Sequence, residues 1–275
     1  MTGFAREVAL QWGAVGCYIA ATVLLVHGVL FEKPRSVRIA TGVAALGLVP
    51  HGTALVFRWI ESGHGPYMLR YEVLSSNAWV AIAMLVGVLL WRPKAAPIGV
   101  LVLPVAFVLV AVGLFLNPEI RELPPSLRSM WLVFHVTFAK LASGAFLLSL
   151  GSAIVLLWKA RGGKGRLLDR LPDAAALDAY TVRFVGFGFI FWTINVAAGA
   201  VWANESWGRY WGWDVIETWS LITWLGYGSF LHARLFYKLS GRKVAWTAIA
   251  CFLVAIATIF ILPLVLPSIH AAYFQ

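Results

Sequence analysis

Long apolar segments alternate with short polar ones along the whole chain. A helix needs about twenty apolar residues to cross the hydrocarbon core of a bilayer. Eight segments approach or exceed that length: 9–31, 38–60, 77–92, 97–116, 130–158, 182–203, 215–238 and 244–267. The third is short, so this helix is either little tilted or begins before residue 77. The pattern predicts an all-α polytopic membrane protein of about eight transmembrane helices, forming one domain over residues 1–275.

Basic residues choose the orientation of these spans. The connections after the first, third, fifth and seventh spans are rich in Lys and Arg: Lys33, Arg35, Arg38, Arg92, Lys94, Lys159, Arg161, Lys164, Arg166, Arg170, Arg242 and Lys243. The opposite connections hold few: Arg70, Arg121, Arg128 and Arg209. By the positive-inside rule the first set is cytoplasmic. The sequence therefore predicts a multi-pass protein of the cytoplasmic (inner) membrane with both termini on the outer, periplasmic face.

Composition narrows the functional classes. The chain is 61% hydrophobic and only 12% charged, against about 25% charged in ordinary soluble domains. The net charge of +10 is explained by orientation in the bilayer, so no nucleic-acid partner is expected. Cys17 and Cys251 both lie in apolar runs and form no CxxC. The chain is therefore neither a dithiol oxidoreductase nor a c-type cytochrome, which would need CxxCH.

One tryptophan-rich segment lies on the predicted outer face. Residues 202–219 read WANESWGRYWGWDVIETW. His135, near the start of the fifth span, and His270, just past the eighth, reach the same face. Two neutral imidazoles suit the axial ligation of haem iron, aromatic rings suit a porphyrin platform, and Arg209 suits propionates. The alternative is an interfacial aromatic belt beside solvated histidines.

The other membrane histidines lie at different depths. His232 is near the cytoplasmic end of the seventh span, too far inward to share a site with His135 and His270. It marks a possible second site, for which His27 is the candidate partner within this chain. His51, after a proline in the second span, is expected to be a hydrogen-bonded core residue.

These residues resemble those of the cytochrome c assembly family. The run WANESWGRYWGWDVIETWSLITWLGYGSFLHARL is similar to its tryptophan-rich "WWD" region, and most similar to the CcsA type, also called ResC. The segments RWIESGHGPYMLRYEVLSS, WLVFHVTFAKLASGAFLLSL and PSIHAAYF are similar to other parts of that family, so the likeness covers about residues 45–275. Eight spans and His232 favour CcsA over the related CcmC proteins, which usually have six spans, and CcmF is much longer.

The resemblance implies a set of site residues. His135 and His270 match the two outer axial ligands, and His232 matches the inner transmembrane ligand. The haem platform would comprise Trp202, Trp207, Arg209, Tyr210, Trp211, Trp213, Asp214 and Trp219. In the family the second inner ligand comes from a CcsB-type (ResB) membrane protein, and no such portion is present here.

The resemblance also implies an activity. The chain would carry haem b, as substrate, across the membrane and present it for thioether attachment to apocytochromes c bearing CxxCH. It would act as the CcsA subunit of a system II cytochrome c synthase with haem-lyase activity, together with a CcsB-type partner. A thioredoxin-like thiol reductant pathway would supply the reduced cysteines.

Several residues leave alternatives open. Where the family usually has WDPKETWA, this chain has WDVIETWS, with Val215 and Ile216. This departure fits either a divergent synthase or a relative that handles haem without attaching it. Asp214 and Glu217 are expected to cap the seventh span. Lys140 either snorkels outward or meets a propionate, and His64 is either a third haem contact or a turn residue.

Three other functions are compatible with the same histidines. A membrane cytochrome b subunit would use four ligands within the chain and respond to quinol. A haem exporter or chaperone would use the same residues without ligase activity. A structural anchor would bind no chromophore.

Overall fold

The computed structural model describes residues 3–116, 119–120, 122–162 and 166–268 of the chain. This part is helical and contains no strand, which confirms the all-α fold class. Its elements are α1 (Gly3–Leu30), α2 (Pro34–Ser62), α3 (Arg70–Trp91), η1 (Pro93–Ala95), α4 (Ala96–Leu114), η2 (Pro125–Leu127), α5 (Met130–Ala160), α6 (Arg166–Arg170), α7 (Ala174–Trp207), α8 (Val215–Phe236), α9 (Arg242–Ile256), the π-helical turn η3 (Ala257–Ile261) and α10 (Leu262–Val265).

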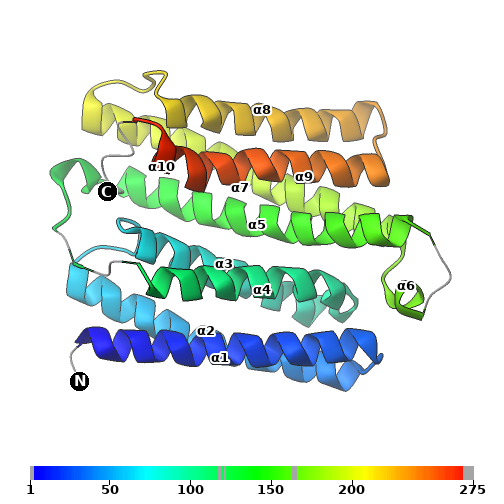
Figure 1. Cartoon of the computed structure of the whole chain (residues 1–275). Helices are drawn as coiled ribbons and strands as arrows, with labels where there is room; N and C mark the ends of the chain where they lie inside the picture. Colours follow the sequence, from blue (N-terminus) through cyan, green and yellow to red (C-terminus); the bar gives the residue numbers. More distant parts are fainter. Residues whose placement is uncertain (1–2, 117–118, 121, 163–165, 269–275) are drawn as a thin grey trace.

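Seven of the helices in the described part are long and apolar enough to cross a membrane, where the sequence pattern predicted eight. The difference is α8, the predicted seventh span. It has 22 residues, so it is about 33 Å long. Its polar and ionisable residues, among them Glu217, His232 and Arg234, lower its hydropathy. In Figure 1, α8 runs the length of the bundle beside α9. It therefore spans the same layer as its neighbours.

The ends of the helices alternate as the predicted topology requires. Figure 1 shows the start of α1, the loop between α7 and α8, and α10 at one end of the bundle. The connections α1–α2, α3–α4 and α8–α9 lie at the other end. The third predicted span begins at Arg70, which explains its apparent shortness. That the end with the tryptophan-rich segment faces outward stays a prediction from charge.

Helix α5 is the centre of the bundle. It packs against α3 and α4 on one side and against α7 and α9 on the other. Glycine permits the close approach of α7, because a Cβ at Gly188 would overlap the Phe146 ring of α5. Phe146 in turn stacks on Tyr227 of α8, with ring centroids 3.8 Å apart. The helix that carries His135 and Lys140 is therefore held from several directions.

A buried ion pair connects the end of α2 to the start of α3. Arg58 Nε donates to Glu72 Oε1 at 2.8 Å, and the two side chains are 2% and 1% exposed. The other carboxylate oxygen accepts from the backbone amides of Met68 and Leu69, at 3.0 and 3.2 Å. One carboxylate therefore neutralises a buried cation and anchors the loop between α2 and α3.

The start of α8 is capped by two acidic residues. Asp214 Oδ2 accepts from the amide of Ile216 at 3.2 Å, and Glu217 Oε2 accepts from the amides of Gly212 and Asp214 at 2.7 and 3.1 Å. This reciprocal arrangement is a capping box. It confirms the predicted capping role of both residues, with Val215 as the first residue of α8.

Replacing Arg58 by Met would leave the Glu72 carboxylate buried without its cation. We expect the free energy of unfolding to fall by about 3 kcal/mol, seen as a lower thermal transition in detergent. Arg38, exposed on the same helix, provides the control, and Arg38→Met should change stability by less than about 0.5 kcal/mol.

The double variant Arg58→Met, Glu72→Gln removes both charges and keeps an acceptor for the two loop amides. It should recover most of the lost stability, because removing a whole buried ion pair is often close to neutral. A double variant no more stable than Arg58→Met would contradict this explanation.

Replacing Asp214 by Ala would remove the side-chain cap of α8. A cap is worth about 1 kcal/mol, so hydrogen exchange at the Ile216 amide should rise about fivefold, whereas Asp214→Asn should restore protection. Asp173 precedes α7 but makes no side-chain capping bond, so Asp173→Ala should leave the exchange of the first α7 amides nearly unchanged. Equal effects of the two alanine variants would show that capping is not the cause.

Candidate functional site

His135 lies in the second turn of α5 and faces α7. Its Nδ1 is 2.9 Å from the backbone oxygen of Asn195. A carbonyl oxygen only accepts, so Nδ1 carries the proton and donates it. In the neutral ring the lone pair is then on Nε2, the nitrogen that a metal would use. The fold therefore selects the tautomer and orientation of this imidazole.

Two residues of α7 hold the ring from the side. A Cβ at Gly199 would lie 2.6 Å from His135 Nδ1, so only glycine leaves room for the imidazole there. Trp202 stacks near the ring, with centroids 6.0 Å apart and planes 25° apart. Asn195, Gly199 and Trp202 are spaced i, i+4 and i+7, which places all three on one face of the helix.

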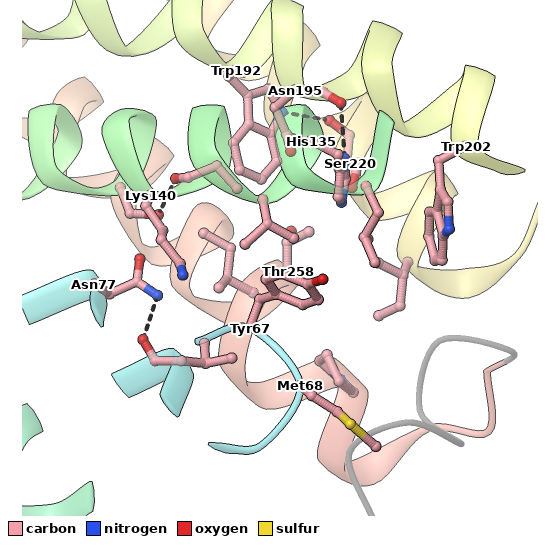
Figure 2. A pocket seen from close by; sticks show the side chains of 18 of the residues that line it. Tyr67, Met68, Asn77, His135, Lys140, Trp192, Asn195, Trp202, Ser220 and Thr258 are labelled. Atoms are coloured by element: carbon pink, nitrogen blue, oxygen red, sulfur yellow. Dashed lines mark hydrogen bonds between the residues drawn. The ribbon is translucent and has the colours of Figure 1, made fainter. Parts of the chain in front are cut away.

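A cavity of about 170 Å³ adjoins His135 (Figure 2). Its walls come from α3, η2, α5, α7, α8, η3 and α10, and they are mostly apolar. Polar groups project among them, from Asn77, Lys140 and Ser220. Tyr67, in the loop between α2 and α3, also lines the cavity, and burial with the nearby Glu72 carboxylate raises the pKa of its phenol. The phenol therefore stays neutral.

A smaller cavity, of about 50 Å³, lies on the side of the tryptophan-rich segment. It is lined by Tyr210, Trp211 and Glu217, and it shares His135, Asn195 and Trp202 with the larger cavity. The imidazole therefore stands between a cavity inside the bundle and a space beneath the loop.

Only part of the predicted tryptophan-rich loop is a loop. Trp202 and Trp207 belong to the last turns of α7, and Trp219 belongs to α8. Trp202 is 3% exposed and donates from Nε1 to the backbone oxygen of Ser126 at 2.8 Å. It forms a buried wall of the histidine site.

The connection 208–214 carries the more exposed rings. Tyr210 and Trp213 are 60% and 70% exposed, and Trp211 meets Trp213 edge to face at 5.9 Å. Trp213 has a positive φ of 58°, a conformation unusual for a bulky residue. Arg209 is exposed and donates to the backbone oxygen of Gly212 at 3.4 Å, so its side chain lies along the loop.

The C-terminal segment reaches this loop. Ser268 donates from Oγ to Asp214 Oδ2 at 2.6 Å. The residue that caps α8 therefore also holds the chain two residues before His270. His270 itself lies outside the described residues.

His27 and His232, which were predicted to lie near the cytoplasmic face, are not brought together. His232 is an exposed residue of α8 and stacks on Phe236, with centroids 4.4 Å apart. His27 is an exposed residue of α1, where its Nδ1 lies 3.2 Å from Ser36 Oγ. Figure 1 shows α1 and α8 on opposite sides of the bundle with other helices between them. Within one chain, His27 therefore does not complete a site with His232.

The remaining candidates have specific partners. His64 is buried in the loop after α2, where Nδ1 donates to the Gly65 backbone oxygen at 2.8 Å, and it does not line either cavity. It is a turn residue. Lys140 does not snorkel to the surface, because it is only 9% exposed and lines the larger cavity. His51 bonds to Tyr18 and Ser75, which confirms it as a core histidine.

Sequence reasoning missed the α7 face that positions His135. Asn195 accepts a hydrogen bond through its backbone oxygen, and Gly199 leaves space because it has no side chain. Neither feature can be recognised from the residue type alone. The helical spacing of Asn195, Gly199 and Trp202 was the available signal, but it becomes informative only once α7 is known to face α5.

Comparisons with known proteins show the family of this chain. A family profile described as "Cytochrome C assembly protein" matches residues 67–270. The "Cytochrome c biogenesis protein CcsA" of Guillardia theta is 33% identical over 253 residues, which cover 82% of this chain and 83% of the relative. The protein of the same name from Gloeobacter violaceus is 31% identical over 308 aligned positions and covers 90% of both chains.

A solved structure shares the fold. "Cytochrome c Heme Lyase CcmF" superposes with a TM-score of 0.68 at 16% identity, and the match covers 94% of this chain but 46% of CcmF. At this identity the likeness concerns the fold alone. The matched profile spans most of the chain, including the fifth to eighth predicted spans and the tryptophan-rich segment. The two curated relatives cover 82% and 90% of the chain. The chain thus belongs to the cytochrome c assembly protein family, with relatives of the CcsA type.

Proposed function

We propose that this protein carries haem across the cytoplasmic membrane and presents it for covalent attachment to apocytochromes c. It would act as the CcsA subunit of a system II cytochrome c synthase. The observation that carries the proposal is the His135 imidazole, which the Asn195 backbone oxygen holds through Nδ1 and which lines an apolar cavity inside the bundle.

The surrounding residues suit haem as the substrate. Neutral imidazole is a common axial ligand of haem iron, and Trp202 provides a flat apolar wall beside it. Tyr210 and Trp213 extend exposed rings from the loop above. These residues would hold the iron and shield the faces of the macrocycle while leaving an edge open.

The attachment chemistry needs little from the protein beyond position. Each cysteine thiol of CxxCH adds across one vinyl group of haem. A C–S bond forms, the thiol hydrogen passes to the neighbouring vinyl carbon, and no electrons are gained or lost overall. The protein would supply proximity and orientation, because the haem and the thiols contain the reacting groups.

His270 is proposed as the second outer ligand. The support is the bond from Ser268 to Asp214, which holds the chain two residues earlier at the loop end of the bundle. The same bond links the tryptophan-rich loop to the C-terminal segment. One side chain would thereby couple the cap of α8 to the position of the second ligand.

His232 is proposed as an inner ligand completed by another protein. Its ring is exposed on α8, and the described residues offer it no second imidazole. A CcsB-type membrane protein packed against α8 would supply one. The apocytochrome, and a thioredoxin-like pathway that keeps its thiols reduced, are the other proposed partners.

A haem exporter or chaperone without ligase activity is the second candidate. It is favoured by Val215 and Ile216, which replace the Pro-Lys that is usual in the family. The intact capping box weakens this argument, because α8 begins in the same way without those residues.

A spectrum of the purified protein with haem added tests the outer site. The wild type should show a six-coordinate haem, and His135→Ala and His270→Ala should each lose or change it, since each removes an axial ligand. His232→Ala should leave the outer signal intact. A spectrum unaffected by His135→Ala would refute the ligand assignment.

Gly199→Ala tests the support of His135 without touching a ligand. The new Cβ would lie 2.6 Å from His135 Nδ1, so the ring must shift, and haem affinity should fall about tenfold for an overpacking cost near 1.4 kcal/mol. Gly186, on the same helix, has open space where its Cβ would be, so Gly186→Ala should bind haem normally. Equal behaviour of the two variants would contradict the proposed geometry.

Ligase activity is tested by co-expression with a CcsB-type protein and a CxxCH apocytochrome. Haem that stays on the cytochrome after denaturing electrophoresis shows thioether bonds. Haem binding without covalent product would favour the exporter or chaperone.

A further inference from the structure

Lys140 is a buried cation that the proposed function does not yet use. It lies on α5, five residues after His135, and is 9% exposed. Its Nζ donates to the backbone oxygen of Pro66 at 2.8 Å. Figure 2 shows the side chain reaching along the cavity wall on the side of Asn77, with Trp202 at the far side of His135.

The charge of Lys140 is not neutralised by a contacting carboxylate. An ammonium group has three donors, and within the described residues only the Pro66 oxygen accepts from it. The acidic neighbour Glu72 is already bound to Arg58 and to two backbone amides. A charge buried within a membrane span is costly and calls for a partner.

The position of Lys140 relative to His135 is informative. Five residues along a helix correspond to about 7.5 Å, and both side chains line the same cavity. The cavity, at about 170 Å³, is smaller than the roughly 300–1,000 Å³ of pockets that enclose a whole ligand of drug size. It therefore suits one arm of a larger ligand that is held at His135.

The lining favours a short chain that ends in an anion. Most of the wall is apolar, for example at Leu132, Val136 and Trp192. The Asn77 amide, which donates to the Val73 oxygen at 2.7 Å, and Lys140 lie on the same side of the cavity, away from Trp202 (Figure 2). An aliphatic arm would pack against the apolar wall, and its terminal carboxylate would meet the Asn77 amide and the Lys140 ammonium.

We propose that Lys140 binds a propionate of the haem held at His135, with that propionate pointing into the bundle. The inference rests on the proposed function. It assigns an orientation to the substrate: the propionate edge faces inward along α5, so the opposite edge of the macrocycle faces the exposed loop 208–214. The reacting edge would then be the one that an incoming cysteine pair can reach.

The test compares haem with its dimethyl ester, in which both propionates are neutral. Each is titrated into the detergent-purified full chain and followed by absorption. Wild type should bind haem about ten- to hundredfold more tightly than the ester, as expected for a charge-assisted hydrogen bond. In Lys140→Met this preference should disappear while the His135-dependent spectrum persists, and Lys140→Arg should retain much of it.

Lys159 provides a matched control. It also lies on α5, and its Nζ donates to the backbone oxygen of Leu168 at 2.6 Å, far along the helix from the cavity. Lys159→Met should keep the full preference for haem over the ester. This control separates loss of a lysine–carbonyl bond on α5 from loss of the carboxylate site.

The outcomes distinguish the two proposals. An equal preference for haem in wild type and Lys140→Met, or no preference in wild type, would overturn the role of Lys140 while leaving the His135 site intact. A spectrum that does not depend on His135 would overturn the proposed function itself. If Lys140→Met binds neither ligand, Lys140→Arg decides: retained preference supports the carboxylate site, and lost preference overturns it.

Discussion

The contact between α5 and α7 is the constraint on which the site depends. Two glycines of α7 accept aromatic rings of α5, Gly188 beside Phe146 and Gly199 beside His135. Between lipid-embedded helices there is little hydrophobic drive to associate, so close packing at small residues decides which faces meet. Here the same packing that holds the helices together also orients the imidazole toward Asn195. Helix packing and the orientation of His135 are therefore set by one interface.

The second constraint is the cost of polar groups in hydrocarbon. Each must be satisfied within the bundle, and most of those near the loop end are. The Arg58–Glu72 pair anchors the loop after α2, and that loop presents Tyr67 to the cavity and the Pro66 oxygen to Lys140. Arg58 of α2, Glu72 of α3 and the loop between them thus shape one wall of the cavity beside His135. Arg58, which precedes the family match at residues 67–270, therefore still contributes to the site by anchoring this loop.

The tryptophan-rich segment has two physical roles rather than one. Trp202 is a buried wall that touches the histidine side chain, and Tyr210 and Trp213 are exposed on the loop. Asp214 joins these parts, since it caps α8 and receives the bond from Ser268. The segment is both a structural junction of α7, α8 and the C-terminal residues and a surface beside the proposed haem site. Residues of a simple interfacial aromatic belt would not need to form such a structural junction.

Much of this architecture could be predicted from the sequence, because membrane insertion is read from composition. The lengths of the apolar segments located the long helices in the sequence. They also located α8, although its polar residues give it a lower hydropathy than the other long helices. Capping chemistry is local, so the roles of Asp214 and Glu217 were also predictable. His135 stood out because an ionisable group near a span end is rare.

Other features required the tertiary structure. The separation of His27 from His232 follows from how α1 and α8 are arranged around the bundle, and depth in the membrane alone cannot reveal it. Asn195 and Gly199 act through a backbone oxygen and a missing side chain, which have meaning only opposite His135. Lys140 could have turned to the lipid surface or into the bundle. Lys140 points into the bundle because the face of α5 that carries it packs against the loop after α2. This packing leaves its ammonium group beside the cavity.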